Sequence, residues 1–203
     1  MKNQVQLITY VDRLGGSGVQ ALHQLLTTSL EGVFGGVHLL PFYTPIDGSD
    51  AGFDPDDHLT VDPRLGDWGD VLELSNSTDV MADLIVNHVS SRSPQFADVV
   101  ARGSDSPWFP LFLTYQSVFP DGAREAEITA IYRPRPSLPW TPYTLGDTKH
   151  LMWTTFTPQQ LDINVETEVG RAYLDSILDR FEQSGVSMIR LDAAGYAIKR
   201  PGT

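Results

Sequence analysis

The chain of 203 residues contains no cysteine, which excludes disulfide bonds and thiolate chemistry. Basic residues are scarce, with 14 Lys and Arg against 26 Asp and Glu and a net charge of −12. A chain this acidic lacks the basic face that nucleic acids and anionic membranes require. No apolar run approaches the length that spans a bilayer, and the first residues carry no apolar core of a secretion signal. We therefore expect a soluble, cytoplasmic protein without a nucleic acid or membrane partner.

Four short apolar runs, at residues 5–10, 36–40, 80–86 and 186–191, predict β-strands. The third run is apolar on both faces, as in a parallel sheet that is covered on both sides. Helical periodicity predicts helices at about 19–30, 67–74 and 165–183. Strands and helices therefore alternate, and right-handed crossovers would make the sheet parallel. This order suits either a doubly wound sheet or the first half of a (β/α)8 barrel.

Residues 87–157 interrupt the alternation. They hold most of the prolines and three of the four tryptophans, and they show no regular strand or helix period. Such a segment is typical of an inserted subdomain or a long loop excursion rather than of a βα repeat.

The fourth predicted strand ends in a charged pair. Side chains alternate along a strand, so Arg190 and Asp192 share one face. A guanidinium group next to a carboxylate favours its ionised form. An ionised and partly desolvated aspartate suits nucleophilic attack at the anomeric carbon of a sugar. The alternative is a buried ion pair that only compensates its own charges.

Polar residues also follow the second and third predicted strands. His88 emerges where the third strand ends and could bind a ligand hydroxyl, or it is structural; Asp83, inside that strand, is expected to hold neighbouring loops. The predicted loop at 44–66 combines Phe53 with many carboxylates, which suits sugar binding. A calcium site and a plain solvated acidic loop are the alternatives. This loop contains Asp47, Asp50, Asp54, Asp56, Asp57 and His58.

Two loops were considered as phosphate-binding sites. Gly15, Gly16 and Gly18 follow the first strand with the wrong spacing for a dinucleotide-binding loop. Arg135 lies between two prolines, which could fix it as an anion donor. The alternative is a surface loop that is stiffened by proline.

The runs DLIVNH at 83–88 and IRLDA at 189–193 resemble the first and second signature regions of the α-amylase clan of glycoside hydrolases and transglycosylases. Within that clan the finer pattern is similar to the sucrose phosphorylases, and the resemblance covers essentially the whole chain. The supporting segments are 6–10, 40–43, 50–54, 131–136 and 156–162.

The resemblance implies an α/β fold, namely the first half of a (β/α)8 TIM barrel with about strands 1–4 and an irregular inserted subdomain after strand 3. Residues 1–86 and 158–203 would form the partial catalytic barrel, and residues 87–157 the inserted subdomain. It implies retaining transfer of glucose from sucrose to phosphate, giving α-D-glucose 1-phosphate and fructose. No metal or other cofactor is implied, and a homodimer of the full-length enzyme is left open.

The resemblance also implies roles for individual residues. Asp192 would form a β-glucosyl ester, and Arg190 would orient it and stabilise its charge. The other implied roles are hydroxyl binding by Asp50 and His88, apolar walls from Phe53 and Phe156, contacts on the acceptor side from Gln160 and Tyr196, and a phosphate contact from Arg135.

The general acid of this clan, a Glu, and its second stabilising Asp come from later barrel strands. Retention needs two carboxyl groups roughly 5–5.5 Å apart, and Glu73, Glu125 and Glu166 lie in helical or inserted positions that suit this poorly. We therefore expect a truncated chain that is inactive alone. Three alternatives stay open: an α-glucosidase or isomerase of the clan, a phosphorylase with another acceptor such as fructose 6-phosphate, glycerol or glycerate, and a non-catalytic sugar-binding fragment.

Overall fold

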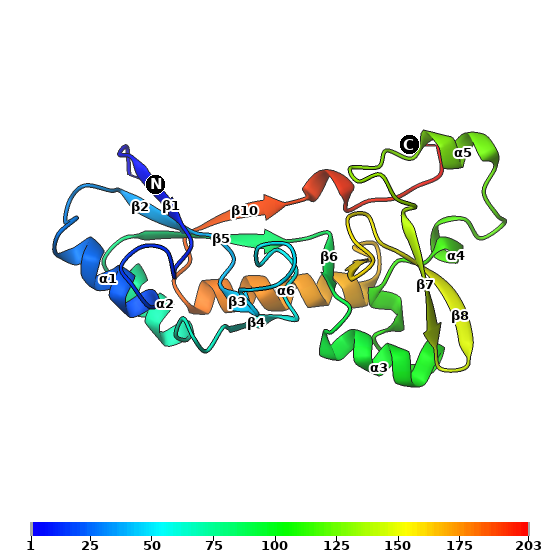
Figure 1. Ribbon diagram of the computed structural model, residues 1–203, viewed down its shortest axis with the longest axis horizontal. Coiled ribbons are helices and arrows are strands. Elements are labelled where there is room, and N and C mark those ends of the chain that lie inside the picture. Colours follow the sequence, from blue (N-terminus) through cyan, green and yellow to red (C-terminus); the bar gives the residue numbers. More distant parts are fainter. Residues whose placement is uncertain (1, 203) are drawn as a thin grey trace. The chain divides into compact units, whose positions relative to one another are not determined.

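The computed structural model describes residues 2–202 and divides them into two compact units (Figure 1). The first unit runs up to Leu84 and includes Asp175–Asp192; the second comprises Ile85–Leu174 and the residues from Ala193 on. The predicted domain boundaries at 86/87 and 157/158 stay a prediction. Among residues 2–202, no helix combines the length and the apolar character that crossing a membrane demands.

A four-stranded sheet forms the first unit. Its strands are β1 (Gln6–Thr9), β2 (Gly36–Leu39), β5 (Asp79–Ile85) and β10 (Met188–Asp192), and they lie side by side in that order. β2 is parallel to both β1 and β5, and Figure 1 shows β10 running in the same direction as β5. A doubly wound sheet reverses its strand order at a switch point, whereas this order follows the chain without reversal. The topology therefore favours the barrel over the doubly wound sheet.

The four predicted strands are all present, and none of their ends moves by more than two residues. The three predicted helices are α1 (Val19–Thr27), α2 (Trp68–Ser75) and α6 (Glu168–Gln183). α2 begins at a capping box, in which the Asp67 carboxylate accepts from the backbone N–H groups of Gly69 at 2.7 Å and Asp70 at 3.1 Å. The cap satisfies donors that have no partner inside the helix.

Aromatic side chains fill the core beside this sheet. Phe42 and Tyr43 follow β2, Trp68 comes from α2 and Phe181 from α6. Tyr43 and Trp68 each contact the other three rings, with centroids 4.7–6.4 Å apart. The Tyr43 hydroxyl donates to the backbone carbonyl of Asp83 at 2.6 Å. Burial raises the pKa of this hydroxyl well above its ordinary value, and the Asp83 charge adds to the effect. The tyrosine therefore stays neutral and continues to donate.

The prediction of a loop throughout 44–66 was wrong over part of that segment. β3 (Tyr43–Thr44) pairs antiparallel with β4 (Asp57–Val61), so Asp57 and His58 lie on a strand. The high density of Gly, Asp and Pro hid this strand, although His58 and Val61 are buried in it.

One arginine joins the two ends of the segment between Asp47 and Asp62. Arg64 donates two hydrogen bonds of 2.9 Å to the Asp47 carboxylate and two of 2.9 and 2.7 Å to that of Asp62. Asp62 is buried, and the Arg64 hydrogen bonds lower the pKa of its carboxyl to about 2. The segment that is held in this way carries Asp50 and Phe53.

The second unit is more regular than the sequence predicted. β6 (His88–Ser90) pairs antiparallel with β9 (Gln160–Asp162), and β7 (Trp140–Leu145) pairs with β8 (Thr148–Trp153) across a Gly146–Asp147 turn. Gly146 has a φ of 55°, which suits glycine in such a turn. The unit also contains α3 (Pro94–Arg102), α4 (Tyr115–Val118) and α5 (Glu125–Ala130), and the 3-10 helices η1 (Gly103–Asp105), η2 (Phe109–Leu111) and η3 (Ala194–Tyr196).

Two signals in the sequence could have predicted parts of this unit. Ser93 caps α3 by accepting from Phe96 N, with Pro94 at the first helical position, and the Gly-Asp pair separates two strand-like runs. A separate apolar core supports the unit, formed by Leu113, Val118, Phe119 and Trp153.

Removal of a buried leucine from α2 should destabilise the first unit. Leu74 is fully buried, whereas Leu72 on the same helix is 43% exposed. We expect Leu74→Ala to lower the free energy of unfolding by about 2–5 kcal/mol, because it leaves a cavity, and the control Leu72→Ala to cost clearly less. Circular dichroism during urea unfolding measures both variants. Equal costs would contradict the packing described.

The Arg64 network should make stability depend on acid pH. The folded-state pKa of Asp62, about 2, lies below its ordinary value of 3.8. The ionised carboxylate therefore stabilises the fold above about pH 4, and this contribution is lost as the pH falls from about 4 to about 2. We expect Arg64→Met to lower the urea midpoint at neutral pH and to flatten its decline in that window.

Arg13→Met is the matched control, because Arg13 pairs with Asp12 at 3.4 Å on the surface. Its pH profile should run parallel to that of the parent chain. If the Arg64→Met profile also runs parallel, the network does not act as described.

Candidate active site

The charged pair predicted at the end of the fourth strand is present. Asp192 is the last residue of β10, and its side chain is 17% exposed. Arg190 Nη1 lies 3.0 Å from Asp192 Oδ1. The two side chains share a face because they are two residues apart on a strand. The carboxylate is therefore partly desolvated and lies next to a fixed cation.

Asp83 on β5 determines where this cation lies. Its carboxylate is buried, accepts a hydrogen bond from Arg190 Nη1 through Oδ1, and lies 2.9 Å from His38 Nε2 through Oδ2. The hydrogen bond to Asp83 raises the pKa of Arg190 above its ordinary value, so the guanidinium stays charged. The sequence predicted that Asp83 holds loops; instead it bonds side chains of the two neighbouring strands, β2 and β10.

The loop after β2 brings an aromatic ring to the same place. Arg190 Cζ lies 5.6 Å from the centroid of the Phe53 ring, a cation–π contact. Asp50 lies three residues earlier, and its backbone carbonyl accepts from Phe53 N. Buried Asp54 accepts from Asp50 N at 3.1 Å and from Ser49 Oγ at 3.0 Å, which holds the turn. The first unit thus brings together Asp192, Arg190 and Phe53, with Asp50 on the same turn.

Four acidic residues between 44 and 66 form bonds inside this segment, namely Asp47, Asp54, Asp57 and Asp62. Asp57 accepts from Leu59 N and Thr60 Oγ1, in the same way that Asp54 and Asp62 hold their own turns. Within residues 2–202 the structure has no group of three or more His, Asp or Glu side chains that could hold a metal ion.

Four other predicted residues meet in the second unit. His88 on β6 and Gln160 on β9 are both buried, and their Nε2 atoms lie 3.0 Å apart. The Phe156 ring centroid lies 5.3 Å from that of His88 and 5.2 Å from that of Tyr196. The antiparallel pairing of β6 with β9 explains why residues so far apart in sequence come together. An imidazole, an amide and two aromatic rings offer hydrogen bonds and apolar faces, the two kinds of contact that a sugar needs.

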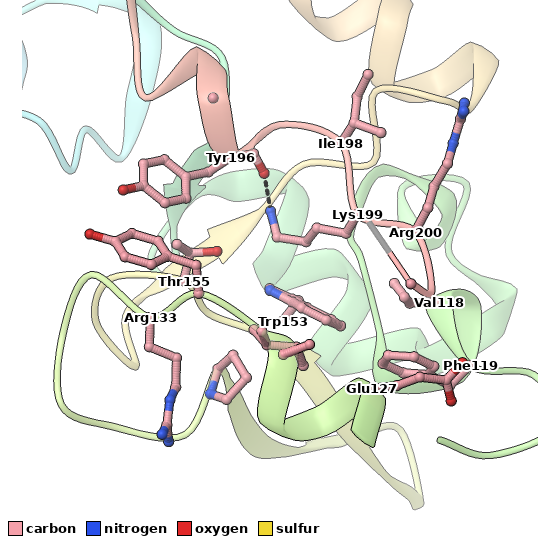
Figure 2. Close-up of a pocket in the computed structure, with 16 residues that line it drawn as sticks. Val118, Phe119, Glu127, Arg133, Trp153, Thr155, Tyr196, Ile198, Lys199 and Arg200 are labelled. Carbon is pink, nitrogen blue, oxygen red and sulfur yellow. Dashed lines mark hydrogen bonds between the residues drawn. The ribbon is translucent and has the colours of Figure 1, made fainter. Parts of the chain in front are cut away.

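A pocket of about 130 Å³ lies beside Tyr196 in the same unit (Figure 2). Its walls include Trp153, Tyr132 and Lys199, and the Tyr132 ring stacks on that of Tyr196 with centroids 6.1 Å apart. Sequence reasoning did not assign a role to Tyr132 or Lys199. Tyr132 belongs to the same short run as Arg135, which is the signal that could have identified it.

Arg135 does not belong to this pocket. Its side chain is exposed, in the segment between α5 and β7, and its neighbour Arg133 lines the pocket instead. The predicted phosphate contact therefore stays a prediction. The three glutamates considered as general acids are also exposed: Glu73 on α2, Glu125 at the start of α5, and Glu166, which pairs with Arg200.

The chain is similar to known proteins in sequence and in fold. The family model of the α-amylase catalytic domain matches residues 32–203. All of this chain aligns with the sucrose phosphorylase of Bifidobacterium adolescentis at 54% identity and with that of Agrobacterium vitis at 56% identity. The chain spans 40% and 42% of the length of these two relatives.

A solved structure shows the same fold. The whole chain matches the crystal structure of the sucrose 6F-phosphate phosphorylase from Thermoanaerobacter thermosaccharolyticum with a TM-score of 0.92 and 35% identity, and covers 42% of it. This similarity confirms the predicted fold class, a partial (β/α)8 barrel. The match of the family model over residues 32–203 shows that the chain belongs to the α-amylase catalytic domain family.

Proposed function

We propose that this chain supplies the nucleophile and part of the sugar site of a retaining glucosyl transferase that moves glucose from sucrose to phosphate. The observation that carries the proposal is the Asp192–Arg190 contact of 3.0 Å, in which Asp83 holds the guanidinium group. The identity of 54–56% to two sucrose phosphorylases supports the choice of donor and acceptor.

In the proposed reaction an Asp192 oxygen attacks the anomeric carbon of sucrose as the bond to the fructosyl oxygen breaks. The electron pair of that bond passes to the fructosyl oxygen, which takes a proton from a general acid. A phosphate oxygen then attacks the β-glucosyl ester and releases the Asp192 carboxylate. Two inversions give net retention, hence α-D-glucose 1-phosphate. Arg190 keeps the carboxylate charged before attack and stabilises it again as it leaves.

The remaining predicted residues take supporting roles in this proposal. Asp50 and His88 bind hydroxyl groups of the glucosyl unit, because a carboxylate accepts and an imidazole can donate or accept. Phe53 and Phe156 pack against its apolar faces. Gln160 and Tyr196 contact the acceptor side, and Arg135 contacts phosphate.

No carboxyl group of this chain is proposed as the general acid. Release of fructose needs a second carboxyl group roughly 5–5.5 Å from the first. The three glutamates considered for this role, Glu73, Glu125 and Glu166, are all exposed. We therefore propose that the 203 residues carry the nucleophile but do not complete phosphorolysis alone.

A donor that needs no acid can test the nucleophile separately. Fluoride leaves without protonation, so 5-fluoro-α-D-glucosyl fluoride should form a stable ester on this chain, visible by mass spectrometry as one added glycosyl group. Peptide mapping should place the ester on Asp192. We expect Asp192→Asn to slow labelling by about 10⁴-fold. Asp179→Asn, an exposed carboxylate on α6, is the control and should label normally. Labelling that persists in Asp192→Asn would refute the assignment.

The complete reaction should be absent from the 203-residue chain. With sucrose and inorganic phosphate we expect no glucose 1-phosphate above the background without protein, because the fructosyl oxygen receives no proton. Chromatographic analysis of the sugars measures this. Turnover by a preparation whose intact mass is 22.4 kDa would contradict the expectation. Free glucose without glucose 1-phosphate would favour a hydrolase of the same family.

A further inference from the structure

Lys199 is a partly buried lysine that none of the roles above uses. It lies in the second unit, and its side chain is only 10% exposed. An ammonium group has three donor hydrogens, and its burial is costly unless they are paired. Lys199 Nζ has three oxygen partners: Asp162 Oδ2 at 2.6 Å, Asn87 Oδ1 at 3.2 Å and the backbone carbonyl of Tyr196. Each donor therefore has an acceptor.

Its main partner is itself held firmly. Asp162 on β9 is fully buried, and its carboxylate also accepts from Thr155 N at 3.0 Å and from Thr155 Oγ1 at 2.5 Å. Asn87 directly precedes β6, which pairs with β9. Lys199 thus ties the residues after Ala193 to both strands of this pair.

The backbone between Ala193 and Lys199 needs such support. Ala193 has a φ of 53°, a left-handed conformation that is unfavourable for a residue with a Cβ atom. Conformations of this kind persist where the surrounding structure imposes them. The 3-10 helix η3 follows at once and ends at Tyr196, whose carbonyl receives the Lys199 hydrogen bond shown in Figure 2.

We propose that Lys199 is a positioning residue for Tyr196. Its buried ion pair with Asp162 holds η3 in place, so that the Tyr196 ring is fixed between Phe156 and Tyr132 as a preformed aromatic wall. A wall that is ordered in advance binds a sugar more tightly, because less conformational freedom is lost on binding. The identity of the ligand as the acceptor sugar rests on the proposed function; the positioning of the ring does not.

Fluorine NMR of the full chain labelled with 3-fluorotyrosine can test the positioning. Comparison with Tyr196→Phe assigns the Tyr196 signal, and Tyr143, which donates to the Pro158 carbonyl at 2.7 Å, reports on the fold of the second unit. We expect Lys199→Met to move the Tyr196 signal toward its random-coil position and to leave that of Tyr143 in place. Lys149→Met, an exposed lysine on β8, is the matched control and should change neither signal.

An unmoved Tyr196 signal in Lys199→Met would overturn the proposal. If Lys199→Met also moves the Tyr143 signal to its random-coil position, the second unit has unfolded. The milder variant Asn87→Ala, which removes only one of the three acceptors, then tests the positioning of Tyr196. A displaced or broadened Tyr196 signal beside an intact Tyr143 signal then supports the proposal. A Tyr196 signal that stays in place overturns it.

Titration with sucrose separates this proposal from the proposed function. We expect sucrose to shift the Tyr196 signal of the parent chain and of Lys149→Met, and to bind Lys199→Met about three- to tenfold more weakly, the cost of ordering one side chain. If the parent chain does not respond to sucrose, the sugar role of this wall fails, while the signal position without sugar still decides the role of Lys199. Equal affinity of Lys199→Met and the parent chain would overturn the claim that positioning aids binding.

Discussion

Burial of the Asp83 carboxylate is the constraint on which the first unit depends. A charge that is removed from water must be paired. The partners of Asp83 lie on the neighbouring strands: His38 on β2 and Arg190 on β10. The registry of three parallel strands therefore sets the position of one guanidinium group. Because Asp192 lies two residues beyond Arg190, the same pairing also places a cation 3.0 Å from the proposed nucleophile. The Asp83–Arg190 pair thus contributes both to the stability of the fold and to the electrostatics of the site.

The second unit repeats this arrangement with different residues. Asp162 is buried and paired with Lys199, and the pair holds the turn that carries Tyr196. A hydrophobic contact alone would not fix the position of such a turn, because dispersion forces depend little on direction. The Lys199 ammonium group defines its position, because it donates both to the Tyr196 carbonyl and to oxygens of Asp162 and Asn87 outside the turn. In both units a buried charge therefore orders a segment that bears a residue of the proposed sugar site.

Sequence reasoning succeeded where the information is local. The period of the apolar residues located the four strands, and strand alternation placed Arg190 beside Asp192. It failed where local composition misleads, as in the segment 44–66, whose β4 strand is hidden among Gly, Asp and Pro. It also missed His38 and Lys199. Their partners lie 45 and 37 residues away in sequence, and no period or motif links residues at such separations.

The sequence by itself determined the alternation of strands and helices, the acidic character of the chain and the motif that contains Asp192, because each depends on neighbouring residues or on simple counts. Only the tertiary structure decided the strand order, which favours a barrel over a doubly wound sheet, and the partners of the buried charges. The physical reason is that a buried carboxylate can be neutralised by any cation that the fold brings within reach. Which cation arrives depends on the pairing and registry of strands that are distant along the chain.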